Sequence, residues 1–457
     1  MAEVQEETTE LVDELARLLE ERRWNQARET VADLPEQDIA ELLLELEKAQ
    51  RIFLFKLLPR SQANEVFAYL TPEHQDALLQ DMTDDETREI LAGLTPDDRT
   101  ALFQELPAPA TQRLMELLPL GERRRAQQLL GYPEESVGRL MTPEYISVRP
   151  DWTIEQSLTH IRAQKERGET VNVIHVTDNR GRLLDVLSIR RFILAEPDDT
   201  VDALMDHHYI SISAFEDREK AVELVQHYDL SALPVVDSEG VLLGIVTLDD
   251  VMDVAEAEAT EDFHKLGSVG GTGTISLREA KPILLYQRRV GWLVMLVFVN
   301  IFSGMAIATF EETIEAVMAL LFFLPLIIAS GGNAGTQSAT LMVRAMATGD
   351  VRSSDWLKLW GKELGVALAL GITMAAAVWG LGVWRGGLDV GYVVAIAMLS
   401  IVLMGSMFGM LLPIILDKFK LDPATASAPL VTTLADVGGI LIYFSIATAF
   451  FSLPEVG

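Results

Sequence analysis

A single carboxylate lies within a long apolar segment near the end of the chain. Asp436 is the only charged residue between positions 423 and 454. An isolated carboxylate in a membrane span costs about 2.5–3.5 kcal/mol or more, and it usually faces water or the interior of a helix bundle. Thr432 and Thr433 precede it, and the glycine-rich stretch 330–338 adds the amide of Asn333. We expect this stretch to be loosened and to expose carbonyl oxygens beside a cavity. The pattern favours an ion pathway; the alternative is an Asp436 that is protonated or paired with a polar group of another span.

The available ligands favour a hard cation. The chain has no cysteine, and all seven histidines precede residue 282. Oxygen ligands suit Mg²⁺, Ca²⁺ or Mn²⁺ better than Zn²⁺ or Cu⁺, and so few carboxylates suit a mostly hydrated ion such as Mg²⁺. An anion channel would need basic groups or helix N-termini at its filter, and an intramembrane metalloprotease would need histidines within a span, so we expect no enzyme. A twofold dimer would place two Asp436 side chains about one axis.

A second group of carboxylates precedes the apolar half of the chain. Seven acids lie between positions 249 and 262: Asp249, Asp250, Asp253, Glu256, Glu258, Glu261 and Asp262. Like charges three and four residues apart weaken a helix by a few tenths of a kcal/mol per pair. Divalent ions would offset this repulsion, so a cation-bridged segment is one interpretation and a solvated helix face is the other.

Charge divides the chain into two halves. The 457 residues carry a net charge of −31, but residues 282–457 carry only −2, which leaves −29 for positions 1–281. Such an acidic chain disfavours nucleic acid as a partner. Charge-free runs at 290–310, 316–343, 364–384 and 390–416, with 423–454, predict five spans in lipid, each long enough to cross about 30 Å. Buried helices of a large soluble protein are the alternative. Basic loop residues put the N-terminal region in the cytoplasm and the C-terminus outside, and 1–14 does not resemble a signal peptide.

The segment 1–135 contains a 12-residue repeat. One apolar series includes Leu46, Leu58 and Leu70, and a second lies nine residues after the first. Thr71, Thr83 and Thr95 are predicted N-caps, and Thr83 with Glu86 forms a predicted capping box. Each unit is a helix of about two turns that needs its neighbours, so we expect a small α-solenoid. It serves as a scaffold, with or without a regulatory surface.

A duplication follows the solenoid. The segment 140–148 reappears at 204–212 and the segment 177–188 reappears at 236–247, so the second copy has a shorter loop at the place that corresponds to Gly168. Each copy is predicted to form a strand, a helix, two further strands and the beginning of a second helix. The pair resembles tandem cystathionine-β-synthase (CBS) domains. Such pairs often bind adenine nucleotides through a Thr-x-x-Asp element. The second copy has Thr247 and Asp250, whereas the first has Ser188 followed by Arg191 in place of the aspartate. The resemblance implies weak binding of ATP, mainly by the second copy, or a purely structural pair.

Several blocks together resemble the MgtE family of bacterial Mg²⁺ transporters. They are Asp249-Asp250-Val251, the acidic run 256–262 followed by His264-Lys265-Leu266-Gly267, Gly331-Gly332-Asn333, Asp422-Pro423, and Leu434-Ala435-Asp436-Val437. The similarity covers nearly the whole chain. It implies a multidomain α and α/β membrane protein with a helical N-domain at 1–135, CBS domains at 136–199 and 200–255, an acidic connecting (plug) helix at 256–281, and five transmembrane helices within 282–457.

The resemblance also implies a function and a set of ligands. It implies a homodimeric Mg²⁺ channel in the bacterial inner membrane, in contact with lipid and without a protein substrate, that mediates influx and is closed by intracellular Mg²⁺. A related Mn²⁺ or Co²⁺ transporter, or a Mg²⁺ exchanger, is the alternative. The implied pore residues are Asp436, Asp422 and Asn333, and Ala428 and Thr336 replace amides found in the family. The implied regulatory ligands are Glu65, Asp97, Asp217, Glu219, Asp229, Asp250, Asp253, Glu258, Glu261 and Asp262.

Overall fold

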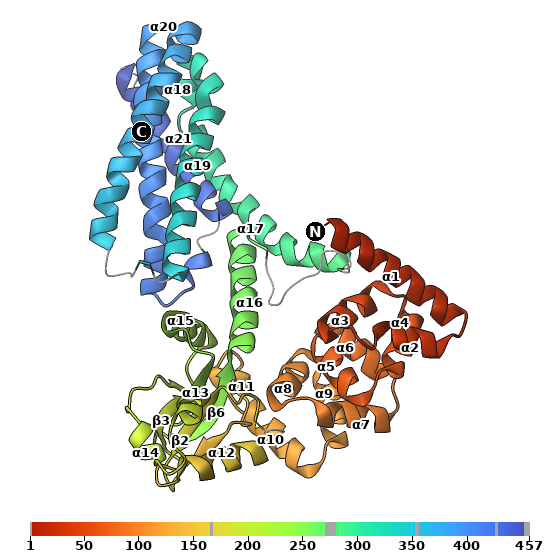
Figure 1. Ribbon diagram of the computed structural model, residues 1–457. Helices are drawn as coiled ribbons and strands as arrows, with labels where there is room; N and C mark the ends of the chain where they lie inside the picture. The colour runs from red at the N-terminus through yellow and green to blue at the C-terminus, as the bar shows by residue number, and fades with distance from the viewer. Residues whose placement is uncertain are drawn as a thin grey trace. The chain divides into compact units, whose positions relative to one another are not determined.

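The computed structural model describes residues 2–164, 168–269, 280, 282–348, 350–351, 356–425 and 428–451 (Figure 1). It divides into two compact units, Met1–Ala255 and Glu256–Gly457. The division falls inside one helix, α16 (Leu248–Leu266). The acidic helix predicted at 256–281 therefore begins eight residues earlier, directly after a strand, and residues 270–279 and 281 of that prediction lie outside the described residues.

The 12-residue repeat forms a stack of short helices, as predicted. After α1 (Ala2–Glu20) and α2 (Trp24–Val31), eight helices begin at 12-residue intervals: α3 (Glu36–Glu45), α4 (Lys48–Leu57), α5 (Arg60–Ala68), α6 (Pro72–Gln80), α7 (Asp84–Gly93), α8 (Pro96–Glu105), α9 (Ala108–Leu117) and α10 (Leu120–Leu130). Both apolar series contribute to one core, in which Phe55, Phe67 and Leu91 are buried. Helices this short are marginal alone, so the shared core stabilises them.

All three predicted N-cap threonines occupy that position, and two of them make the capping hydrogen bond. The Glu86 amide donates to Thr83 Oγ1 and the Thr83 amide donates to Glu86 Oε2, which completes the capping box. Thr95 Oγ1 accepts from the Asp98 amide. Thr71 is the N-cap residue of α6 and precedes Pro72 as predicted, but its hydroxyl makes no capping bond to the backbone and instead forms a hydrogen bond of 2.7 Å with His74 Nδ1.

Each CBS copy contains a three-stranded sheet. In the first, β1 (Ser147–Val148) pairs in parallel with β2 (Val173–Thr177), which pairs antiparallel with β3 (Leu183–Ser188). The second repeats this order in β4 (Ile212–Ser213), β5 (Ala232–Val236) and β6 (Leu242–Thr247). The helices of the pair are α11 (Val137–Leu140), α12 (Ile154–Ala163), α13 (Ile189–Leu194), α14 (Val201–Leu204), α15 (Arg218–Tyr228) and the start of α16.

Equivalent turns join the two CBS copies. Gly181 and Gly240 have φ of +78° and +79° at the β2–β3 and β5–β6 turns, a backbone conformation that favours glycine. The Leu183 amide donates to the Gly240 carbonyl, and the Leu242 amide donates to the Gly181 carbonyl. The copies are therefore paired around their hairpin turns.

The apolar half contains α17 (Pro282–Ala308), α18 (Glu311–Ala316), α19 (Ala319–Ala347), α20 (Trp356–Lys418), the 3₁₀ turn η2 (Pro423–Thr425) and α21 (Ala428–Phe450). Four helices among the described residues are long and apolar enough to span a membrane. One of them, α20, is interrupted at Gly387, and a Cβ on Gly382 would lie 2.7 Å from the Gly391 Cα. In a straight helix those residues would be about 13 Å apart along the axis, so α20 folds back into two arms. Two crossings by α20 would give the five spans, and that number stays a prediction.

Candidate cation sites

A cavity of about 600 Å³ lies among three apolar helices. Its lining consists of Asn300 from α17, Asn333, Thr336 and Gln337 from α19, and Ala428, Pro429, Thr432, Thr433 and Asp436 from α21. The cavity thus brings together Asp436 and Asn333, two of the three predicted pore residues. Asp422 does not line it. Sequence reasoning missed Asn300, whose only signal is that it is the one amide in the apolar run 290–310.

The lining is suited to a hydrated cation. It offers one carboxylate, three carboxamides and three threonine hydroxyls. Thr433 Oγ1 donates to the Pro429 carbonyl at 2.7 Å, and the hydroxyls of Thr336 and Thr432 lie 3.3 Å apart. A water molecule occupies about 30 Å³ of liquid volume, so the cavity has room for an ion together with its water shell.

The glycines of α19 serve helix packing. The sequence predicted a loosened stretch at 330–338, but α19 is helical throughout its 29 residues. A Cβ on Gly409 of α20 would lie 2.0 Å from the Gly335 carbonyl oxygen, and one on Gly405 would lie 2.2 Å from that of Gly331. The prediction of exposed carbonyls is therefore wrong, because these glycines allow two helix backbones to touch.

Asp422 directly precedes η2 and lies beside the end of α16. Its Oδ1 accepts from the Ala424 amide at 2.8 Å, and its Oδ2 accepts from Lys265 Nζ. Lys265 also pairs with Glu261, one turn earlier, at 2.7 Å. The pKa of Asp262 is raised, first by burial and then by the charge of Asp422. Three predicted ligands, Glu261, Asp262 and Asp422, are therefore neighbours, and an ammonium bridges two of them.

Five carboxylates, of which only Asp97 is buried, lie together where the solenoid meets the CBS pair. The acidic group, as we call it, consists of Asp97 and Asp98 of α8, Glu169, and Asp249 and Asp250 of α16. Only 8% of Asp97 is exposed, and its Oδ1 has no hydrogen-bond partner among the described residues. Burial, and then Asp98, raise the pKa of Asp97 to about 6.

The pKa values of other members of the acidic group are raised as well. Burial and then Asp97 raise the pKa of Asp250 to about 8, and they raise that of Glu169 to about 7. Burial also raises the pKa of Asp98. The structure thus brings together two predicted ligands, Asp97 and Asp250, with Asp249 of the predicted acidic run, and it adds Asp98 and Glu169, which were not predicted as ligands.

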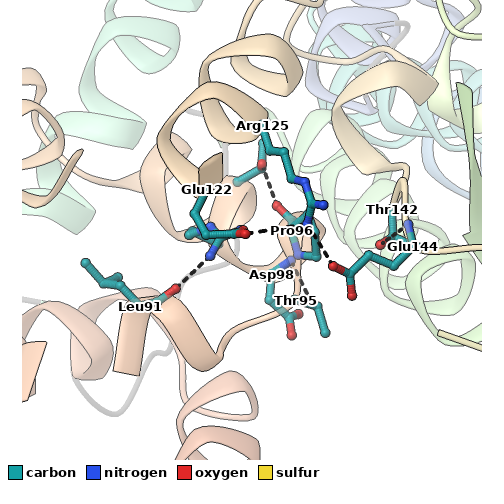
Figure 2. A network of polar contacts seen from close by, with 10 residues as sticks. Leu91, Thr95, Pro96, Asp98, Glu122, Arg125, Thr142 and Glu144 are labelled. Carbon is teal, nitrogen blue, oxygen red and sulfur yellow. Dashed lines mark hydrogen bonds and ion pairs between the residues drawn. The ribbon is translucent and has the colours of Figure 1, made fainter. Parts of the chain in front are cut away.

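A network of ion pairs lies next to the acidic group (Figure 2). Arg99 of α8 is fully buried and pairs with Glu122 of α10 at 2.6 Å, and it also donates to the Leu91 carbonyl. Arg125 pairs with Glu122 at 3.5 Å and with Glu144, at the start of the first CBS copy, at 3.0 Å. These arginines are therefore engaged by other carboxylates.

The remaining predicted regulatory ligands occupy separate places. Asp217 Oδ1 accepts from the Glu219 amide at the start of α15, and Asp229 ends that helix with a left-handed backbone. Glu65 lies in α5, and Asp253 and Glu258 lie in α16. Among the described residues, no three Asp, Glu or His side chains form a group that could hold a metal ion. One or two carboxylates with several waters are the usual Mg²⁺ environment, and the predicted ligand sets stay predictions.

The two CBS copies differ at the predicted nucleotide element. Thr247 Oγ1 donates to Asp250 Oδ2 at 2.6 Å. In the first copy, Ser188 makes no side-chain cap, and Arg191 pairs with Asp206 at 2.7 Å. Arg191 therefore stands at the sequence position where the motif has an aspartate, and its guanidinium is held by Asp206.

Comparisons with known proteins cover most of the chain. Residues 324–446 match the MgtE family described as a divalent cation transporter, 34–135 match the MgtE intracellular N domain, and 137–198 and 201–257 match CBS domains. The chain is 40% identical over 436 residues to the magnesium transporter MgtE of Thermus thermophilus, across 95% of this chain and 97% of that protein. It is 32% identical over 426 residues to MgtE of Bacillus subtilis, across 90% and 94%.

Two solved structures resemble the part outside the apolar half. One is the cytosolic domain of the Mg²⁺ channel MgtE in complex with ATP, with 38% identity and a TM-score of 0.51 over 53% of this chain and 99% of that one. The other is the soluble part of a magnesium transporter, with 26% identity and a TM-score of 0.52 over 55% and 99%.

Proposed function

Because the chain belongs to the MgtE family of magnesium transporters, we propose that it mediates Mg²⁺ influx across the bacterial cell membrane and is closed by Mg²⁺ bound on its cytoplasmic side. The observation that carries the proposal is the cavity at Asp436, where one carboxylate meets amides and hydroxyls from three apolar helices. In this proposal the N-terminal region of the chain is cytoplasmic, the C-terminus is outside, and two copies of the chain form the channel.

The chemistry of the cavity supports a hydrated divalent ion. One carboxylate attracts the cation, while the neutral amide and hydroxyl groups hydrogen-bond its water shell. Mg²⁺ keeps its waters more firmly than most divalent ions. Conduction also requires that the ion leaves, and a single carboxylate with outer-sphere contacts holds it weakly enough.

The acidic group supports regulation by Mg²⁺. When no cation is present, burial and then repulsion between neighbouring carboxylates disfavour the charged forms, and they raise the pKa of Asp97 to about 6 and that of Asp250 to about 8. A bound Mg²⁺ ion would remove that repulsion and hold α8 against the start of α16. Asp253, Glu258, Glu261 and Asp262, further along α16, and Glu65, Asp217, Glu219 and Asp229 are the other proposed regulatory ligands.

The end of α16 supports a link to the pathway. Asp250 lies in the first turn and Lys265 in the last turn of this one helix, and Lys265 contacts Asp422 just before α21. A helix transmits displacement along its axis because its hydrogen bonds keep it stiff. We propose that Mg²⁺ at the acidic group fixes α16 and thereby closes the pathway.

The transport assignment is tested in liposomes that contain the full-length protein. Mg²⁺ flux is measured alone and in competition with Mn²⁺ and Co²⁺, for wild type, Asp436→Asn and Asp436→Ala. Asp389→Asn removes an exposed carboxylate of α20 outside the cavity and is the matched control. We expect both Asp436 variants to lose Mg²⁺ transport while the control retains it. Normal Mg²⁺ flux through a folded Asp436→Ala protein would exclude Asp436 from the pathway, and preferred transport of Mn²⁺ or Co²⁺ would identify a different cargo.

Regulation is tested by limited proteolysis and single-channel recording across a Mg²⁺ titration. We expect Mg²⁺ to protect the region before residue 270 from protease and to close the channel over the same concentration range. Neutralising Asp97 and Asp250 together should leave the channel open at high Mg²⁺. A protease pattern that is independent of Mg²⁺ in the wild type would contradict the sensor.

A further inference from the structure

Asn300 is a polar residue of α17 that lies in the middle of a charge-free run. It is the eleventh residue of the charge-free run 290–310 and the only carboxamide in that run. Burying an amide without a hydrogen bond costs about 2–7 kcal/mol, depending on the reference state. A side chain of this kind in the middle of a span therefore needs a polar neighbour.

The polar neighbours of Asn300 are the residues that line the cavity. Asn300 is the only residue of α17 in the lining, which it shares with Asn333 of α19 and Asp436 of α21. Among the described residues, no protein group forms a hydrogen bond with the Asn300 amide. An asparagine that joined two helices would have such a partner, so the amide is available to whatever fills the cavity.

We propose that Asn300 is a specificity-determining residue, whose amide oxygen accepts a hydrogen bond from the water shell of the cation held near Asp436. The inference rests on the proposed transport function and adds a third helix to the pathway. Waters bound to a divalent ion are polarised and donate strong hydrogen bonds, and acceptors set around the cavity select an ion that keeps its full shell. Mg²⁺ fits this requirement better than cations that shed water readily.

The substitution Asn300→Leu tests the amide while keeping the size of the side chain. A hydrogen bond to a charged partner contributes about 1.5–3 kcal/mol, so we expect half-saturation of flux to need at least about 10-fold more Mg²⁺, with a smaller preference for Mg²⁺ over Mn²⁺ and Co²⁺. Asn300→Gln keeps the amide and should restore part of the preference. Ser303→Ala, one turn along α17 and outside the cavity lining, is the control and should leave both quantities unchanged.

Thermal unfolding in detergent separates this role from a structural one. If the amide serves the ion, Asn300→Leu unfolds at the same temperature as wild type or higher, because leucine suits a membrane span better. If the amide holds helices together, the variant unfolds at a lower temperature, and that result would overturn the inference.

Flux through Asp436→Asn, measured in parallel, separates the inference from the transport assignment. If Asp436→Asn abolishes transport but Asn300→Leu keeps wild-type half-saturation and ion preference, the inference about Asn300 fails and the proposed function stands. If both variants transport normally, the proposed function itself fails. If Asn300→Leu does not fold, wild-type ion preference in a folded Asn300→Ala protein overturns the inference, and a reduced preference supports it.

Discussion

Replacing Asp97 by asparagine should stabilise the Mg²⁺-free protein. Asp97 is 8% exposed, one of its oxygens has no hydrogen-bond partner among the described residues, and its pKa rises from 3.8 to about 6. In the unfolded chain the carboxyl releases its proton near pH 3.8, whereas in the folded chain it does so near pH 6. The folded state therefore binds more protons between these values, and stability falls as the pH rises through that window.

The size of the effect follows from the shift. A displacement of about 2 pKa units corresponds to about 3 kcal/mol, which the folded protein loses fully above about pH 7. Asparagine has nearly the same shape and no charge, so at pH 8 in EDTA the Asp97→Asn protein should be more stable than wild type by up to about 3 kcal/mol. At pH 5 the difference should be smaller by about 1.4 kcal/mol, because there the folded carboxyl is mostly protonated.

Added Mg²⁺ should narrow the difference in stability. A site with a Kd of about 1 mM gains about 1.4 kcal/mol from about 10 mM free ion, which offsets roughly half of the wild-type deficit. Wild type should therefore gain clearly from Mg²⁺, while Asp97→Asn should gain little.

Pulse proteolysis in urea measures these differences on the full-length protein in detergent, with the N-terminal region followed as the readout. Asp85→Asn is the matched control, because Asp85 holds the equivalent position in the preceding repeat, is exposed and pairs with Arg88 at 2.6 Å. An exposed pair contributes about 0.2–1 kcal/mol, so the control should be slightly less stable than wild type at every Mg²⁺ concentration. An Asp97→Asn protein that is less stable than wild type in EDTA at pH 8 would refute the reasoning.

Three further predictions concern contacts elsewhere in the chain. Lys265→Met removes the ammonium between Glu261 and Asp422; single-channel recording should show more opening at low Mg²⁺ and a steeper Mg²⁺ dependence, whereas Lys265→Arg should behave like wild type. Gly409→Ala should lower the thermal unfolding temperature, because its Cβ would lie 2.0 Å from a carbonyl oxygen of α19 and overpacking costs about 1–3 kcal/mol; Gly380→Ala, with open space around it, should not. Calorimetry should detect ATP binding that Asp250→Ala weakens and Arg191→Ala leaves unchanged; equal affinity in all three proteins would exclude the second CBS copy as the main site.

Local patterns predicted most of the fold. The 12-residue repeat places an apolar residue on the same side of every short helix, and helices α3 to α10 begin at the same interval. Thr83 and Glu86 determine their helix start through bonds between positions only three apart. The CBS strands and their glycine turns are equally local, since both copies carry the same order of apolar residues and turn residues.

The candidate sites depend on contacts that periodicity does not contain. Asp98 and Glu169 have the sequence pattern of ordinary solvated acids, and only the packing of the solenoid on the CBS pair brings them near Asp97. Asn300 is one polar residue in an apolar run, and its role depends on which face of α17 borders the cavity. The glycines of α19 misled the prediction because flexibility and close packing require the same residue type.

The two kinds of cation site that we propose for this chain require opposite designs. In the cavity, one carboxylate lies among neutral amide and hydroxyl groups, and further carboxylates there would slow release of the ion, which conduction cannot tolerate. In the acidic group, several carboxylates are crowded until burial and mutual repulsion raise their pKa values. That crowding makes the ion-free arrangement costly, so a single bound ion changes the balance between two conformations by more than a weak surface site could. The transported ion can therefore act as its own regulator without one site having to be both fast to release and strong enough to close the channel.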